Sequence, residues 1–417
     1  MVIIGILFFI FGFVTWLNGS LIPFLKIICD LNDTQALFVT FAFYIAYTTM
    51  AYPMSFILSK SGYKKGMAIG LGIMALGALL LIPAALSANY ILFLIALFTL
   101  GSGLTILQTA SNPYIVLVGP SESAAMRISV MGLINKSAGI LAPLVFTALM
   151  FSDLGTLTND LLSPEEINLL ASKLIMPYLV MAVILIGLIF LVLFSSLPEI
   201  AFDEREENAE KTNILHYPQI VLGSIALFFY VGVEVVAGDT IGLFGQHLGV
   251  ENYTTLTSYT MVFMVLGYII GVLAIPKYLS QERALVFSAI GGFATVTALL
   301  FSSPDSTTVS ALLWGWSGLS TIPNPVALVA LLGLSHALVW PAIWPLALEG
   351  LGKFTAQGSA LLIMAIAGGA LLPLLFAQVS SLSHNMQFAY VITLPAYLFI
   401  LYYARKGHKL REWNTQQ

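Results

Sequence analysis

Residues 139–146 read Gly-Ile-Leu-Ala-Pro-Leu-Val-Phe, and residues 369–376 read Gly-Ala-Leu-Leu-Pro-Leu-Leu-Phe. Both stretches follow the pattern G-x-L-x-P-L-x-F, and they lie 230 positions apart. A second match has nearly the same offset and pairs a glycine with a later proline: Gly101 with Pro113, and Gly333 with Pro345. Chance matches between apolar helices are common, but two pairs at nearly the same offset indicate that the two halves of the chain arose by duplication.

The composition excludes a soluble protein. Hydrophobic residues make up 59% of the 417 residues and charged residues only 9%, whereas soluble domains carry about 25% charged residues. The net charge of −4 indicates no nucleic-acid partner. A single cysteine, Cys29, excludes an internal disulfide framework and a zinc site built on cysteine pairs. The apolar segment from Val2 has no basic start and no cleavage site, so we expect a spanning helix and not a signal peptide.

Polar residues divide the chain into twelve apolar segments of the length needed to cross a bilayer, about 20 residues each. Helices are expected, because lipid cannot satisfy the backbone groups of open strands. The sequence therefore predicts an all-α polytopic membrane protein. The predicted spans are 2–28, 34–59, 66–87, 89–118, 124–150, 174–196, 218–247, 254–277, 282–303, 325–350, 354–380 and 385–404.

Basic residues predict the orientation. With the N-terminus in the cytoplasm, 13 of the 16 Lys and Arg residues fall in internal loops and the C-terminal tail, and only Lys26 and Lys173 fall in outer loops. This asymmetry is the positive-inside pattern of inner-membrane proteins. An even number of spans then puts both termini in the cytoplasm. We expect a monomer embedded in the cytoplasmic membrane.

The longest polar internal stretch, 197–217, contains the acidic cluster Asp-Glu-Arg-Glu-Glu at 203–207 and reads as a solvated linker. It separates a predicted six-helix bundle at 1–196 from a second at 218–404, and residues 405–417 form a tail. Parallel six-helix repeats are typical of the major facilitator superfamily, in which the substrate lies between the halves. We expect a central cavity lined by helices 1, 4, 7 and 10.

Longer motifs carry a closer resemblance. Gln-Thr-Ala-Ser-Asn-Pro-Tyr at 108–114, with Leu-Val-Gly-Pro at 117–120 and Arg127, resembles the helix 4–5 signature of the fucose–galactose–glucose branch of that superfamily. Phe-Tyr-Val-Gly-Val-Glu-Val at 229–235 and Trp-Pro-Ala-Ile-Trp at 340–344 look like its glucose/galactose and N-acetylglucosamine members. The resemblance covers nearly the whole chain, and it implies uptake of a sugar coupled to a cation.

The sequence departs from this branch at two positions. The fucose–proton symporter carries acidic residues in helix 1 and helix 4, and the matching positions here are Gly19 and Gln108. Neither residue can carry a proton, so coupling must use another group. A sodium ion could use Asn18, Ser20, nearby backbone carbonyls and one acidic side chain, and we favour sodium over protons. No bound cofactor is expected apart from the coupling Na⁺ or H⁺.

Ionisable groups at membrane depth are costly, so they are functional candidates. Tyr230 and Glu234 share one face of helix 7. The Glu234 carboxylate could carry a proton, ligate sodium or accept sugar hydroxyls, and the alternative is a structural pair with Lys136. Asp239 lies about 7–8 Å further along the axis. It is a second candidate for cation coupling, and the alternative is a residue in an external vestibule.

Amide and aromatic side chains complete the predicted sugar site. Gln108, Asn112 and Asn135 can donate to and accept from the hydroxyls of a neutral sugar, although amides also join membrane helices to one another. Aromatic rings pack on the C–H faces of sugars, and core packing is the alternative. The aromatic candidates are Trp16 in helix 1 and the stripe of His336, Trp340 and Trp344 at intervals of four in helix 10.

The sequence thus predicts a cation-coupled symporter for a neutral hexose such as glucose or galactose. N-acetylglucosamine or fucose symport and an uncoupled facilitative sugar carrier remain alternatives. An intramembrane enzyme using Glu234 and Asp239 is a more distant one, since residues five apart do not face each other on a helix. No nucleotide-binding or metalloprotease motif is present, so no enzymatic activity is expected.

Overall fold

The computed structural model describes residues 2–117, 124–151, 164–195, 197, 214–275 and 278–413, and within these ranges all regular structure is helical. Short helices and turns connect the long ones: α6 (Pro164–Ser172), η3 (Tyr253–Thr255), α11 (Thr308–Trp314), η6 (Ala365–Ala367) and α16 (Met386–Ala389). The long helices are α1 (Val2–Ile28), α2 (Asp33–Thr49), α3 (Ala51–Leu86), α4 (Tyr90–Leu117), α5 (Ala124–Phe151), α7 (Ile175–Leu193), α8 (Pro218–His247), α9 (Leu256–Ala274), α10 (Gln281–Phe301), α12 (Asn324–His336), α13 (Val339–Leu348), α14 (Thr355–Met364), α15 (Gly368–Ser383) and α17 (Thr393–Arg405).

Eleven helical segments within the described ranges are long and apolar enough to cross a membrane. The predicted span that is not among these eleven is 34–59. It begins with α2, which has only 17 residues before the helix breaks at Met50. The prediction of an all-α polytopic membrane protein is therefore confirmed.

Three predicted spans differ in detail. The span at 34–59 is α2 followed by the start of α3, and α3 then turns sharply at Gly62, whose φ of 76° favours glycine. The span at 325–350 is two helices, α12 and α13, because the chain breaks after His336. The span at 354–380 is interrupted by the 3-10 turn η6, which lies between α14 and α15. Periodicity alone could not reveal these breaks, since the residues on both sides are apolar.

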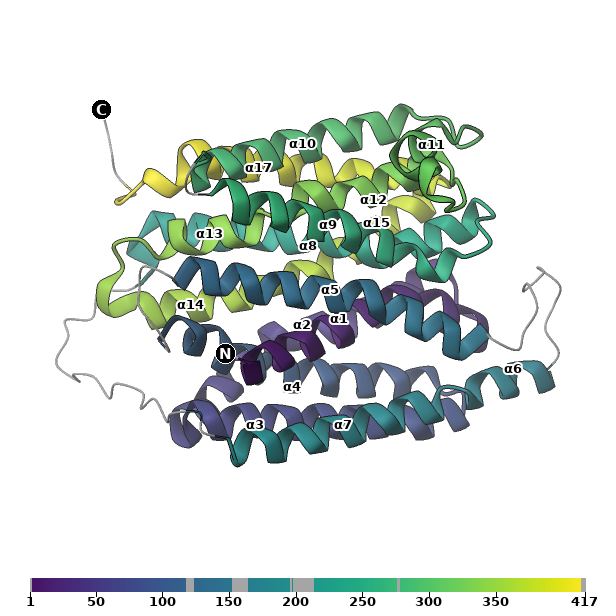
Figure 1. Cartoon of the computed structure of the whole chain (residues 1–417), viewed down its shortest axis with the longest axis horizontal. Coiled ribbons are helices and arrows are strands. Elements are labelled where there is room, and N and C mark those ends of the chain that lie inside the picture. Colours follow the sequence, from purple (N-terminus) through teal and green to yellow (C-terminus); the bar gives the residue numbers. More distant parts are fainter. Residues whose placement is uncertain are drawn as a thin grey trace.

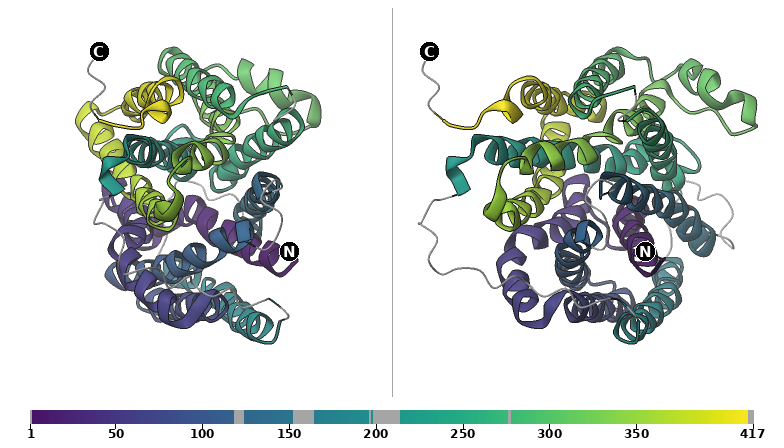
Figure 2. Two further views of the ribbon diagram at one scale, coloured as in Figure 1. Left: turned by 90° about the vertical axis from the view of Figure 1, so that its left-hand side faces the viewer. Right: turned by 60° about the vertical axis from the view of Figure 1, so that its left-hand side comes forward.

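The helices form two groups that follow the sequence (Figures 1 and 2). In the first group α1 packs on α5, and α3 packs on α4 and α7; in the second, α12 packs on α9 and α10, and α15 packs on α8. The most extensive contacts between the two groups are those of α5 with α9, α2 with α15, and α1 with α8. The predicted linker at 197–217 lies mostly outside the described residues, so its boundaries stay a prediction.

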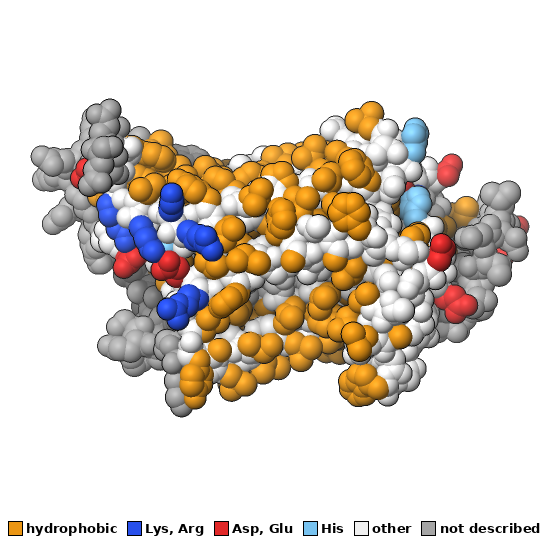
Figure 3. Space-filling view, turned by 90° about the horizontal axis from the view of Figure 1, so that it is seen from above, with side chains coloured by type: hydrophobic (Ala, Val, Ile, Leu, Met, Phe, Trp, Pro, Cys, Tyr) orange, Lys and Arg blue, Asp and Glu red, His pale blue; other side chains and the backbone are white. Residues whose placement is uncertain are grey.

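On the face seen in Figure 3, hydrophobic side chains cover the middle of the molecule, and charged groups lie toward its two ends. We call the end that holds the start of α1 and residues 405–413 the inner end, and the opposite end the outer end. On the face shown in Figure 3, Lys and Arg gather at the inner end with a few acidic residues beside them, whereas Asp, Glu and His are seen without Lys or Arg at the outer end. This distribution agrees with the predicted orientation, which itself stays a prediction.

Close packing inside each group depends on glycine. At Gly333 of α12, a Cβ atom would lie 2.1 Å from the carbonyl oxygen of Thr260 in α9. This backbone cannot move away without separating the two helices. Small residues at such crossings let membrane helices approach closely.

We therefore expect Gly333→Ala to lower the free energy of unfolding by about 1–3 kcal/mol, the usual cost of overpacking. The matched control is Gly187→Ala in α7, where a Cβ would meet nothing within 4 Å. Thermal unfolding in detergent measures both variants. Equal melting temperatures for Gly333→Ala and the parent would contradict this account of the α9–α12 contact.

Candidate functional site

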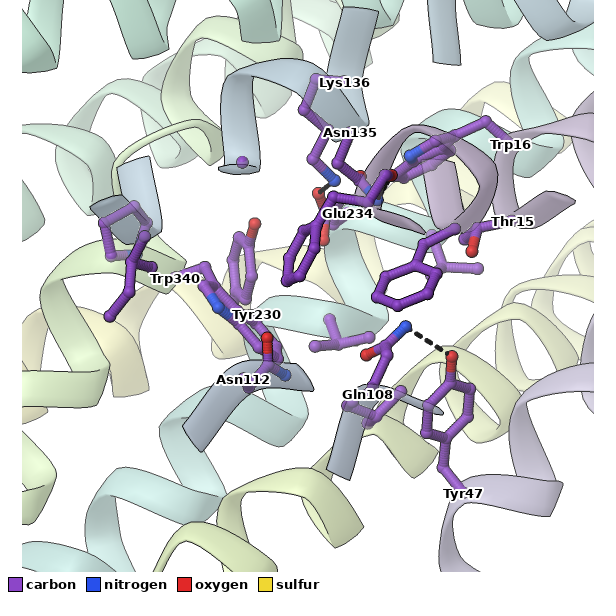
Figure 4. A pocket seen from close by; sticks show the side chains of 18 of the residues that line it. Thr15, Trp16, Tyr47, Gln108, Asn112, Asn135, Lys136, Tyr230, Glu234 and Trp340 are labelled. Atoms are coloured by element: carbon purple, nitrogen blue, oxygen red, sulfur yellow. Dashed lines mark hydrogen bonds and ion pairs between the residues drawn. The ribbon is translucent and has the colours of Figure 1, made fainter. Parts of the chain in front are cut away.

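A cavity of about 880 Å³, including its open mouth, lies between the two helix groups. Its walls come from α1, α2, α4, α5, α8, α9, η6 and α13. The predicted helices 1, 4, 7 and 10 correspond to α1, α4, α8 and α12–α13, and all contribute except α12. Seven of the predicted site residues line this one space (Figure 4): Trp16, Gln108, Asn112, Asn135, Tyr230, Glu234 and Trp340.

The first helix group supplies amides to the cavity. The Gln108 Nε2 atom donates to the Tyr47 hydroxyl at 2.9 Å, so Tyr47 of α2 orients the Gln108 side chain. Asn135 Nδ2 donates to the backbone carbonyl of Phe8 at 3.2 Å. Asn112 lies one turn after Gln108 on the cavity side of α4. These residues present amide groups to a half-open space, where a polyhydroxyl ligand could exchange hydrogen bonds with them.

The second helix group supplies aromatic rings and a carboxylate. The ring centroids of Tyr230 and Trp340 lie 6.5 Å apart, and those of Trp340 and Trp344 lie 5.6 Å apart. Glu234 follows Tyr230 by one turn of α8. Its Oε1 atom lies 2.6 Å from the Nζ atom of Lys136. Both charged residues are buried. The ion pair therefore joins α5 to α8, across the boundary between the two groups.

Trp16 closes the cavity toward the outer end. Its indole lies between Gly139 of α5 and Gly238 of α8, where added Cβ atoms would come within 2.7 and 2.4 Å of the ring. The Lys136 ammonium lies 4.3 Å from the indole centroid, a distance at which a cation is attracted to the ring face. Trp16 is thus both a lining residue and the wedge between the two groups.

Trp344 packs on Trp340 but does not line the cavity, and four other predicted residues also lie outside it. His336 is fully buried and exchanges a hydrogen bond with the Tyr397 hydroxyl at 2.7 Å, because the chain break after α12 takes it out of line with Trp340. Asn18 lines a small, mostly apolar pocket among Leu97, Tyr178 and other residues of the first group. The Ser20 hydroxyl instead donates to the carbonyl of Thr254 at 2.5 Å. Asn18 and Ser20 therefore do not meet at a common sodium site.

Asp239, the fourth, is fully buried and accepts a hydrogen bond from the Thr40 hydroxyl of α2 at 3.0 Å. Its other carboxylate oxygen has no hydrogen-bond partner. Asp239 thus belongs to a contact between the two groups and not to the cavity wall. Within the described residues, no three His, Cys, Asp or Glu side chains are arranged to hold a metal ion.

Several lining residues were not among the predicted site residues: Thr15, Tyr44, Tyr47, Lys136 and Tyr268. Tyr44 and Tyr47 lie three apart and face the cavity from α2. A tyrosine pair at helical spacing was a usable signal, but tyrosine is common in membrane helices. Lys136 was recognised only as a possible partner of Glu234.

Polar contacts hold the outer ends of the two groups together. Besides the Thr40–Asp239 bond, Thr147 of α5 exchanges a hydrogen bond with Thr254 of η3 at 2.9 Å. Asp33 of α2 pairs with His247 of α8 at 2.8 Å. The lining residues Phe8, Ile115 and Ile128 lie toward the inner ends of α1, α4 and α5. The cavity therefore extends to the inner end and is closed at the outer end.

The sequence model of the family described as the Major Facilitator Superfamily matches residues 4–377 of this chain. The chain belongs to this superfamily. It is 32% identical over 410 residues to a glucose/galactose transporter of Brucella abortus, covering 97% of this chain and 93% of the relative. It is 27% identical to the L-fucose-proton symporter of Escherichia coli, covering 96% and 91%. The superfamily and these relatives identify a multi-pass membrane transporter and not an enzyme.

Solved structures share the fold. A crystal structure of the E. coli fucose:proton symporter matches with a TM-score of 0.73 at 23% identity, covering 97% of each chain. A partially occluded, inward-open xylose transporter from E. coli matches with a TM-score of 0.67 at 14% identity, covering 100% of this chain and 98% of that one. The predicted fold, two six-helix bundles of the major facilitator type, is therefore confirmed.

The outer closure makes a testable prediction. Thr40→Val keeps the shape of the side chain but leaves the buried Asp239 carboxylate without its donor, at a cost of about 1–2 kcal/mol in the closed state. We expect the ratio of outer-open to outer-closed protein to rise about five- to thirtyfold. Distances between spin labels at Leu86 and Glu251, two exposed outer positions in different groups, measure this ratio.

The control for this prediction is Thr105→Val, because the Thr105 hydroxyl bonds only within its own helix, to the carbonyl of Gly101. An unchanged distance distribution in Thr40→Val would show that the Asp239 contact does not hold the outer ends together.

Proposed function

We propose that this chain is a cation-coupled symporter that imports a neutral hexose, such as glucose or galactose, by alternating access. One observation carries the proposal: the amides of Gln108, Asn112 and Asn135 face the rings of Tyr230 and Trp340 across one cavity. A hexose has polar hydroxyls at its edge and apolar C–H groups on its faces. Such a ligand needs both kinds of partner at once.

The charge of the site supports a neutral sugar. Its two buried charges, Lys136 and Glu234, neutralise each other at 2.6 Å. A ligand with a net charge would therefore meet no unpaired counter-charge among these lining residues.

Coupling is assigned to Glu234. Among the described lining residues it is the acidic one, and Tyr230 and Tyr268 line the same cavity near enough to interact electrostatically with its carboxylate. Because Asn18 and Ser20 diverge, the coupling cation is proposed at Glu234 and not beside Gly19. A proton or a sodium ion could neutralise this carboxylate, and the fucose relatives are named proton symporters. Imposed sodium and proton gradients, tested separately, distinguish the two.

Two alternatives concern the same site. N-acetylglucosamine or fucose could replace the hexose, because both offer the same pattern of polar edge and apolar face. An uncoupled carrier would use the same cavity without a cation. Uptake of labelled glucose, galactose, fucose and N-acetylglucosamine into proteoliposomes, with and without ion gradients, separates these cases.

For the substrate site we expect Gln108→Ala to weaken sugar binding by about 1–3 kcal/mol, or roughly five- to 150-fold, the range for losing a buried polar partner. The control is Gln357→Ala, an exposed amide of α14. Equilibrium binding of the transported sugar to purified protein gives both affinities. Parent-like affinity in both Gln108→Ala and Asn135→Ala would remove these amides from the sugar site.

For coupling we expect Glu234→Gln to abolish gradient-driven sugar accumulation while leaving part of the sugar counterflow exchange. The amide keeps the shape of the side chain but cannot take up a proton or balance a cation charge. Glu251→Gln, at an exposed outer position, is the matched control. Full accumulation by Glu234→Gln would refute its role, and Asp239 would become the next candidate.

A further inference from the structure

The ion pair between Lys136 and Glu234 has a placement that substrate binding alone does not explain. Its Nζ–Oε1 distance is 2.6 Å, and the two side chains are only 11% and 8% exposed. Lys136 belongs to α5 of the first helix group and Glu234 to α8 of the second. The pair is thus a charged contact between the two helix groups, and Figure 4 shows the two side chains meeting at the cavity wall.

The Lys136 ammonium occupies the place that a coupling cation would take. The Glu234 carboxylate is paired with Lys136 from α5, and the other titratable groups near enough to interact with it electrostatically are Tyr268 from α9, Tyr44 from α2, and Tyr230 and Asp239 from its own helix. Lys136 is the one cation in this set. Two cations competing for one buried carboxylate repel each other strongly, because the interior screens charge weakly.

The pair also depends on closure at the outer end. One turn after Lys136, Gly139 packs on the Trp16 indole, and one turn after Glu234, Gly238 packs on the same ring. The Lys136 ammonium lies over that ring as well. If the outer ends of α5 and α8 move apart, the indole loses one wall and the ammonium is drawn away from the carboxylate.

We infer that Lys136 is a tethered counter-cation, which replaces the coupling cation on Glu234 whenever the cavity is open at the inner end. The inference rests on the proposed coupling role of Glu234. In the outer-open state the pair is separated, and Glu234 is free to bind a sodium ion or a proton from outside. In the inner-open state Lys136 returns to Glu234 and displaces that cation toward the cytoplasm.

Cation binding to Glu234 and opening of the Lys136–Glu234 pair are thermodynamically linked, so each affects the other. Because closing the pair lowers the affinity of Glu234 for a cation, binding of the cation must favour the state in which the pair is open. An external cation therefore prepares the carrier to accept sugar from outside. The empty carrier returns with a neutral centre, since Lys136 balances the carboxylate that the cation has left.

The test measures the cation concentration that half-activates sugar binding, by titrating sodium at fixed pH and by titrating protons without sodium. The variants are Lys136→Met, which removes the charge at similar length, and Lys136→Arg, which keeps it. We expect Lys136→Met to lower the half-activating concentration about tenfold, as a coupling energy of ordinary size implies. Lys136→Arg should stay near the parent, and Glu234→Gln should lose the cation response.

The control is Lys406→Met, which removes an exposed lysine at the inner end. A purely structural bridge would change sugar affinity or yield without moving the half-activating concentration. An unchanged value in Lys136→Met, with sugar binding intact, would therefore overturn the inference. A parent that exchanges sugar but shows no cation response would overturn both this inference and the coupling assigned to Glu234. A parent that exchanges none of the four sugars would refute the proposed substrate.

A second measurement needs no change at Lys136. Spin labels at Leu86 and Glu251 in a Cys29→Ser background report the separation of the outer ends. Replacing Cys29 removes the native thiol of the chain. Burial raises the pKa of this thiol to about 11, which disfavours the reactive thiolate. The activating cation alone should widen the distance distribution in the parent but not in Glu234→Gln. An unchanged distribution in the parent would contradict the linkage.

Discussion

The Glu234 carboxylate lies at membrane depth, where removing a charge from water costs several kcal/mol unless a partner compensates. Its partner, Lys136, comes from the other helix group, 98 positions away in the sequence. Neither group alone can bury its charged residue at low cost, so the ion pair favours the approach of α5 and α8. Trp16 packs beside the pair, against Gly139 of α5 and Gly238 of α8.

The contacts around the pair form a graded closure. Trp16 fills the space between two glycines next to the ion pair, Thr40 bonds to Asp239 further out, and Asp33 meets His247 at the surface. Each contact joins residues of the two groups, and each polar one can be replaced by water when the ends separate. Contacts of this kind stabilise the closed outer end without raising the free energy of the open state so far that opening is prevented. Apolar contacts of similar extent would be harder to separate, because opening would expose their hydrophobic surface to water.

Breaks in the helices shape the wall opposite the amides. The end of α12 at His336 turns that imidazole into the core, where it pairs with Tyr397, while Trp340 at the start of α13 faces the cavity. The regular four-residue spacing of His336, Trp340 and Trp344 predicted one continuous stripe, and the break divides it. Asn18 and Ser20 diverge for a related reason. Residues two apart on a helix point in nearly opposite directions, so they contact different neighbours.

The sequence by itself determined the membrane class, the superfamily fold and seven of the polar and aromatic residues that line the cavity. These follow from local rules: apolar segments must be helical in lipid, and polar residues within them must face protein or water. Only the tertiary structure decided that Lys136 meets Glu234, that Tyr47 orients Gln108, and that Asp239 belongs to the outer closure. Each of these contacts joins helices whose relative rotation and depth depend on packing over their whole length, and no local pattern in the chain encodes that geometry.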